Sequence, residues 1–142
     1  SLQATGNAVA LLALGSVGTE LERADAYSDI DFFAFVEPGS KQKFIDDPTW
    51  LNADNKLVWI FRNSRDGFKI LWEDGIFGEM AVFEMSELPT IGYAPGRIVW
   101  SKPEIDLGIF ERPTSTGRRN LQVDVEYNQR ELLSNLYVGL GR

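Results

Sequence analysis

The distribution of apolar and polar residues predicts a chain built mainly from short strands. Residues 8–14 and 29–36 are apolar runs separated by a polar connector, and the second run is apolar on both faces, which is typical of a strand covered on both sides. Residues 56–84 contain three further hydrophobic runs separated by turn segments that end in Asp-Gly, the pattern of an antiparallel meander. Residues 97–101 predict one more short strand.

Helical patterns accompany these strands. Residues 17–28 can form a short helix, and residues 40–52 predict a helix interrupted near Pro48, because proline cannot continue a helix. Residues 117–138 predict a longer helix at the end of the chain. Its apolar stripe includes Leu121, Val125, Leu132 and Leu136. We therefore expect an α/β (α+β) fold in which flanking helices and a C-terminal helix pack around a mixed, mostly antiparallel sheet.

Two aspartates stand at the start of the second apolar run. Successive side chains of a strand point to opposite faces, so Asp29 and Asp31 are expected on one face, roughly 6.5 to 7 Å apart at the backbone. Like charges at the edge of a core repel each other and lose hydration, and a divalent cation would relieve both costs. The alternative is a strand that has emerged into solvent, with both aspartates hydrated.

The first apolar run ends in Gly15 and Ser16, a pair small enough for a tight turn. Such a turn lets the backbone approach a ligand closely, and its amide groups and hydroxyl suit phosphate oxygens. The sequence therefore places a candidate phosphate site directly after the first strand.

A third carboxylate, Glu79, lies in the middle of the last meander strand. It shares a strand face with Phe77, Ala81 and Phe83, and a carboxylate among such neighbours is expected to be paired or functional. The structural alternative is an ion pair with Lys69 or Arg62 across the hairpin.

The amino-acid composition excludes several kinds of catalytic and metal site. The 142-residue chain, expected to form one domain, contains no cysteine and no histidine, which excludes disulfides, thiol nucleophiles, imidazole bases and Cys/His zinc sites. A metal would need oxygen ligands, a preference of Mg²⁺ or Mn²⁺. The net charge of −7 argues against a nucleic-acid substrate. The apolar runs are too short to span a bilayer, so we expect no membrane association and a cytoplasmic protein.

The order of strand, Gly-Ser turn, connector and Asp-Ile-Asp strand resembles the signature of the DNA polymerase β-like nucleotidyltransferase superfamily. The segment Tyr27-Ser28-Asp29-Ile30-Asp31 has the form seen in its small-molecule members. The similarity is strongest to the antibiotic nucleotidyltransferases, in particular the lincosamide type, and extends from about residue 8 to residue 137. It implies a nucleotidyltransferase palm, with residues 1–113 as the catalytic domain and residues 114–142 as the start of a C-terminal helical region.

The resemblance also implies roles for individual residues. Asp29, Asp31 and Glu79 would hold Mg²⁺ (or Mn²⁺), and Gly15 and Ser16 would bind the nucleoside triphosphate. Glu79 would complete the metal site or act as general base towards the acceptor. The implied reaction transfers a nucleoside monophosphate to a hydroxyl of a small molecule, such as a lincosamide or aminoglycoside antibiotic, and releases pyrophosphate.

The chain departs from the family in its connector, which is longer than usual between Ser16 and Asp29 and lacks a second characteristic glycine. Family members continue into helices that help to bind the acceptor and often dimerise, so a homodimer through the C-terminal helices is expected. The alternative function is a nucleotidyltransferase-like antitoxin or regulatory module that binds a helical partner protein. Retention of all three carboxylates favours the enzyme.

Overall fold

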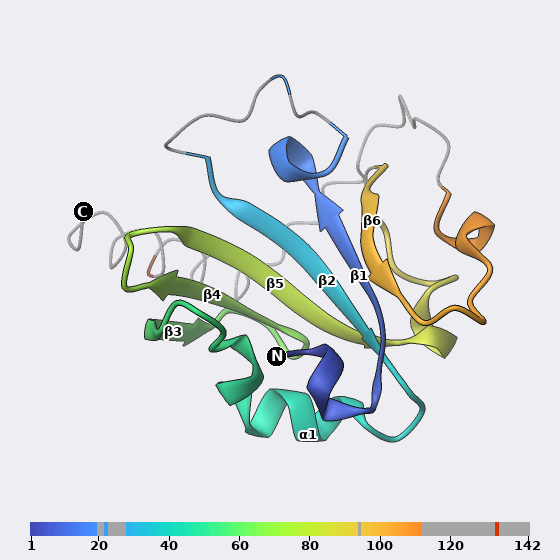
Figure 1. The fold of residues 1–142 in the computed structure, drawn as a ribbon, viewed down its shortest axis with the longest axis horizontal. Coiled ribbons are helices and arrows are strands. Elements are labelled where there is room, and N and C mark those ends of the chain that lie inside the picture. Colours follow the sequence, from blue (N-terminus) through green and yellow to red (C-terminus); the bar gives the residue numbers. More distant parts are fainter. Residues whose placement is uncertain (20–21, 23–27, 94, 112–132, 134–142) are drawn as a thin grey trace.

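The computed structural model describes residues 1–19, 22, 28–93, 95–111 and 133, and these residues are organised around a six-stranded sheet (Figure 1). The strand order across the sheet is β3-β4-β5-β2-β1-β6. The strands are β1 (Ala8–Leu14), β2 (Ile30–Val36), β3 (Leu57–Arg62), β4 (Gly67–Trp72), β5 (Phe77–Glu84) and β6 (Arg97–Ser101). Each expected strand is present, although β2 begins at Ile30 and leaves Asp29 just outside it.

The sheet is mixed and mostly antiparallel, as the sequence predicts. Strand β2 pairs antiparallel with β1 and parallel with β5. Strands β3, β4 and β5 form the antiparallel meander, and β6 pairs antiparallel with β1 at the other edge. The parallel β2–β5 pair therefore joins the meander to the first two strands and lies in the middle of the sheet (Figure 1).

Within the described residues, helical structure is short. The interruption expected at Pro48 is present, because α1 (Lys41–Asp46) ends before it and the 3₁₀ helix η4 (Pro48–Leu51) begins at the proline. The side chain of Asp47 caps η4 by accepting a hydrogen bond from the Thr49 amide. The remaining 3₁₀ helices are η1 (Gln3–Thr5), η2 (Gly15–Val17), η5 (Met85–Glu87) and η6 (Leu107–Phe110).

Both faces of β2 are buried from Phe32 onward, as its apolar run predicts. On one face, Phe32 and Val36 belong to a cluster that α1 and η4 cover with Phe44, Ile45 and Leu51. On the other face, Phe35 lies fully buried in a second cluster. That cluster also contains Val9, Ala10, Leu12, Phe83, Leu88 and Phe110. The face that carries Asp31 is the one occupied by this second cluster, since Phe33 and Phe35 follow Asp31 at two-residue intervals.

Gly78 shows why a glycine precedes Glu79. A Cβ atom at this position would lie 2.9 Å from the carbonyl oxygen of Ile30 and 3.1 Å from a ring carbon of Trp72. A side chain would push β5 away from both neighbouring strands. The glycine therefore allows the close packing that sets the position of Glu79.

Several expectations fall on parts of the chain that the structure does not describe. They include most of the expected short helix at residues 17–28, the boundary at residues 113 and 114, and the apolar stripe of residues 121–136. Leu133 is described, and it is α-helical with a relative exposure of 51%. In the described part of the chain no helix is both long and apolar enough to cross a membrane.

Candidate functional site

Three charged residues form one row across the middle of the sheet. In the strand register, Asp31 of β2 lies opposite Glu79 of β5, and Glu79 lies opposite Lys69 of β4. Neighbouring strands are about 4.8 Å apart, so side chains in such a row are direct neighbours on one face. We call Lys69, Glu79 and Asp31 the charged row. The register thus brings together two of the three carboxylates that the sequence singled out.

Asp31 is half-buried, and its surroundings disfavour its charge. Burial raises the pKa of Asp31 and the nearby charge of Asp29 raises it further, whereas the charge of Lys69 lowers it. The two aspartates are therefore close enough to interact, as expected from their spacing. Asp29 itself is exposed and lies before the strand, so only Asp31 is fixed by strand pairing.

The Gly-Ser turn lies directly against Asp31. Gly15 has a φ of 55°, in the left-handed region that favours glycine, and a Cβ atom there would lie 3.5 Å from Asp31 Oδ2. The turn is held in place by hydrogen bonds, since the Gly18 amide donates to the carbonyl oxygens of Leu14 and Gly15. Ser16 is half-buried within η2. The two ends of the candidate signature, separated by the connector in sequence, are thus adjacent in space.

Replacing Gly15 with alanine is expected to cost about 1–2 kcal/mol of stability, because alanine is strained in the left-handed region. The sequence predicts that this turn binds phosphate, so the substitution should also weaken binding of a nucleoside triphosphate by changing the shape of the turn. Gly39→Ala is the matched control, because Gly39 has a φ of 77° with open space around it and lies beyond the far end of β2. Thermal melts with and without Mg-ATP measure both effects. Equal losses of nucleotide response in the two variants would contradict a phosphate role for Gly15.

Glu79 is held from two sides. Asn63 Nδ2 donates a 2.8 Å hydrogen bond to Glu79 Oε1, and Lys69 Nζ lies 3.9 Å from Glu79 Oε2. The ion pair with Lys69 that the sequence offered as an alternative is therefore present. Arg62, the other cation considered, donates hydrogen bonds to the carbonyl oxygens of Ser64 and Arg65. The Glu79 side chain is still 42% exposed, so it is available to a ligand.

A cavity of about 360 Å³ opens beside the charged row. Gly15, Asp31, Asn63, Glu79 and Tyr93 contribute to its lining, whereas Asp29 and Ser16 do not. Sequence reasoning missed Asn63 as a site residue, because its place directly after β3 marks it only as the start of a turn. The cavity thus joins residues from β1, β2, β4, β5, η2 and two loops.

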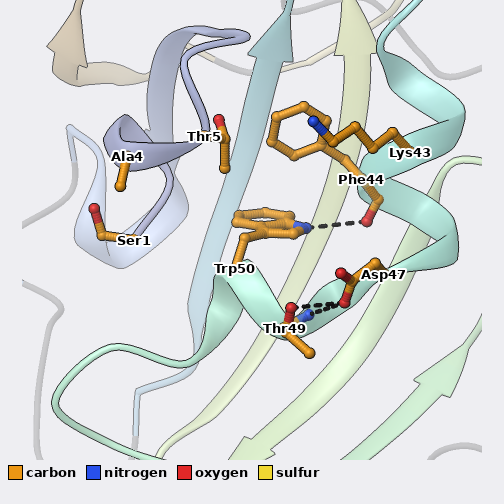
Figure 2. A pocket seen from close by; sticks show the side chains of 8 residues that line it. All are labelled: Ser1, Ala4, Thr5, Lys43, Phe44, Asp47, Thr49 and Trp50. Carbon is orange, nitrogen blue, oxygen red and sulfur yellow. Dashed lines mark hydrogen bonds between the residues drawn. The ribbon is translucent and has the colours of Figure 1, made fainter.

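A second cavity, of about 290 Å³, lies on the opposite face of the sheet, between η1, α1 and η4 (Figure 2). Several of its polar groups bond within the protein. The indole nitrogen of Trp50 donates to the carbonyl oxygen of Phe44, and Asp47 accepts hydrogen bonds from the amide and hydroxyl of Thr49 (Figure 2). This cavity therefore has fewer polar groups available to a ligand than the one beside the charged row.

The donor set at the charged row is suited to a hard cation. Asp31 and Glu79 supply carboxylate oxygens, and Mg²⁺ is commonly bound through one or two carboxylates together with substrate phosphates. Across the residues that the structure describes, no three acidic side chains already stand close enough to hold a metal ion by themselves. The site thus fits a cation that arrives with a phosphate ligand, and a metal site made from all three carboxylates stays a prediction.

Comparison with known proteins does not assign the chain to a family. No family model matches the chain, and no curated protein matches it. The function of the chain is therefore inferred from the charged row, the Gly15 turn and the cavity that both line.

Proposed function

We propose that this protein transfers a nucleoside monophosphate from a Mg²⁺-bound nucleoside triphosphate to a hydroxyl group of a small molecule, releasing pyrophosphate. The observation that carries the proposal is the juxtaposition of Asp31 with Glu79 on one side and with the Gly15 turn on the other. Nucleotidyl transfer needs carboxylates for a cation and a backbone turn for phosphates at one point. Asp31, Glu79 and Gly15, which could meet these two needs, all line the same cavity.

The sheet supports a nucleotidyltransferase palm as the finer description of the fold. The strand that ends in the Gly-Ser turn and the strand that carries Asp31 lie together. Here β1 and β2 are antiparallel neighbours, and Leu14, just before the turn, lies opposite Asp31. We also propose that the C-terminal region, residues 114–142, contributes to a homodimer.

Different residues of the chain would have different roles in the reaction. Asp29 and Asp31 would hold Mg²⁺, and the Gly15–Ser16 turn would bind phosphate oxygens through its backbone. Glu79 would complete the metal site or act as the general base. A cation held by these carboxylates would offset the negative charge on the reacting phosphates. As the general base, Glu79 takes the proton of the acceptor hydroxyl while the hydroxyl oxygen bonds to the α-phosphorus. The bond from the α-phosphorus to the bridging oxygen breaks, and pyrophosphate leaves with that oxygen.

A small acceptor suits the net charge of −7, which would repel a nucleic acid. Lincosamide and aminoglycoside antibiotics carry several hydroxyl groups and positive charge, so they are the first candidates. A cationic acceptor would be attracted to the exposed carboxylates Asp29 and Glu79.

Pyrophosphate release is the decisive assay. The chain is incubated with Mg²⁺, each of the four common ribonucleoside triphosphates and a panel of lincosamides and aminoglycosides. We expect release with at least one pair, with a nucleotidylated acceptor visible by mass spectrometry. No release from any pair, together with no change in melting temperature on adding Mg-nucleotide, would contradict the proposal.

A further inference from the structure

Lys69 is unusual because it is a lysine inside the protein. Its relative exposure is 4%, and no other charged residue in the described part of the chain is buried. Lysines normally keep their amine in water, since burying a charge is costly unless a partner compensates. A methionine of similar length would fill the same space at β4. The retained charge therefore needs a reason.

Its position in the charged row supplies that reason. Lys69 is the cross-strand neighbour of Glu79, its amine lies 3.9 Å from Glu79 Oε2, and its charge reaches Asp31. Glu79 stands between Lys69 and Asp31, so without the ammonium two carboxylates would face each other across β2 and β5. Like charges directly opposite each other destabilise a sheet.

Two other lysines show what a purely structural ion pair looks like here. Lys41 bonds to Asp66 and Glu87, where it connects α1 to the β3–β4 loop and to η5. Lys102 bonds to Glu37 just beyond the end of β2, roughly 20 Å along that strand from Asp31. Neither pair includes a residue that lines the cavity beside the charged row. Lys69 instead pairs with the carboxylate that does.

We propose that Lys69 is a positioning residue, a built-in cation that holds Glu79 beside Asp31 before any metal ion binds. The ammonium stabilises the side-by-side carboxylates in the resting protein and keeps Glu79 aimed into the cavity. It also opposes the binding of a free divalent cation, so that the site accepts the cation mainly when it arrives with nucleotide phosphates. This inference rests on the proposed nucleotidyl transfer for its kinetic consequence, but not for its consequences for stability and metal binding.

The test compares Lys69→Met with the wild type and with Lys102→Met, which removes the same charge at the far end of β2. Lys69→Met is expected to lower the melting temperature and to bind free Mn²⁺, measured by electron paramagnetic resonance, on the order of tenfold more tightly, because a positive charge has left the site. In the proposed reaction kcat should fall at least tenfold with little change in KM for the nucleotide. Lys69→Arg, which restores the charge, should return Mn²⁺ affinity to the wild-type value. Lys102→Met should leave Mn²⁺ affinity and kcat unchanged.

A double substitution separates positioning from simple packing. In a Glu79→Gln background, Lys69→Met should cost much less in melting temperature than in the wild type, because the carboxylate that it holds is already neutral. If Lys69→Met alone does not fold, the double variant is expected to fold. Failure of both to fold would overturn the proposal, since the need for Lys69 would then not depend on the carboxylate of Glu79.

The outcomes also distinguish this inference from the proposed function. An active wild type whose Lys69→Met variant keeps its Mn²⁺ affinity and kcat would overturn the positioning role and leave nucleotidyl transfer intact. A wild type that binds Mn²⁺ and follows the expected Lys69 pattern, but releases no pyrophosphate, would support the positioning role and contradict the transfer reaction. A wild type that binds no Mn²⁺ with or without nucleotide would overturn both.

Discussion

Replacing Asp31 with asparagine is expected to lower nucleotidyl transfer by roughly 10³ or more and, at the same time, to raise the melting temperature of the metal-free protein at neutral pH. The loss of activity follows from the proposed function, in which Asp31 would be a ligand of the cation, and such a cation contributes several kcal/mol of charge stabilisation. The two changes have opposite signs. A residue that merely supports the fold would lower both activity and stability.

The gain in stability has a definite physical origin. Burial and the neighbouring Asp29 raise the pKa of Asp31 above the value in the unfolded chain, although Lys69 opposes them. Such a group lowers the free energy of unfolding at every pH above its folded-state pKa, and the penalty disappears below its unfolded-state pKa. Asparagine carries no charge at any pH. The difference in melting temperature between variant and wild type should therefore be present at neutral pH and vanish towards acid pH.

The response to ligand gives a second measurement of the Asp31 prediction. Mg-nucleotide at one hundred times its Kd stabilises a folded protein by about 2.7 kcal/mol, which is on the order of 10 °C for a domain of this size. The wild type should show this shift and Asp31→Asn should lose most of it. Asp54→Asn, which removes the same charge from an exposed loop, is the control and should keep the shift. An undiminished shift in Asp31→Asn would remove Asp31 from the site.

Replacing Glu79 with glutamine is expected to lower turnover by roughly 10² or more, the usual scale for the loss of a general base, while binding of Mg-nucleotide is kept. The amide can still accept the hydrogen bond from Asn63, but it cannot take a proton from the acceptor hydroxyl. It also leaves Lys69 without its carboxylate partner at 3.9 Å, so a modest loss of stability should accompany the loss of rate.

The control for Glu79 lies on the same strand. Glu84 of β5 accepts a hydrogen bond from the Gly39 amide at the far end of the sheet, so Glu84→Gln should change stability only. Turnover and melting temperature are measured on one preparation of each variant. A Glu79→Gln protein that is destabilised but as active as the wild type would show that Glu79 serves only the ion pair with Lys69.

The local pattern of apolar and polar residues was sufficient to predict where the strands lie in the sequence. The apolar run at residues 8–14 coincides with β1 (Ala8–Leu14), and residues 97–101 coincide with β6 (Arg97–Ser101). The Asp74-Gly75 turn separates β4 from β5 as expected, with Gly75 at a φ of 85°. These features depend on neighbours in sequence, through two-residue periodicity and turn conformation, so the sequence alone determines them.

Tertiary structure alone decided how the strands assemble into a site. The parallel pairing of β2 with β5 places Asp31 opposite Glu79, residues that lie far apart in the chain, and a shift of one residue would have turned Glu79 to the other face. Such a register follows from the packing of both sheet faces, where Gly78 admits the carbonyl oxygen of Ile30. The burial of Lys69 was equally invisible in the sequence, because its loss of solvent arises only when β4, β5 and β2 come together. The sequence presented the Lys69 pair and a functional Glu79 as alternatives, whereas the folded sheet puts the lysine and both carboxylates in one row.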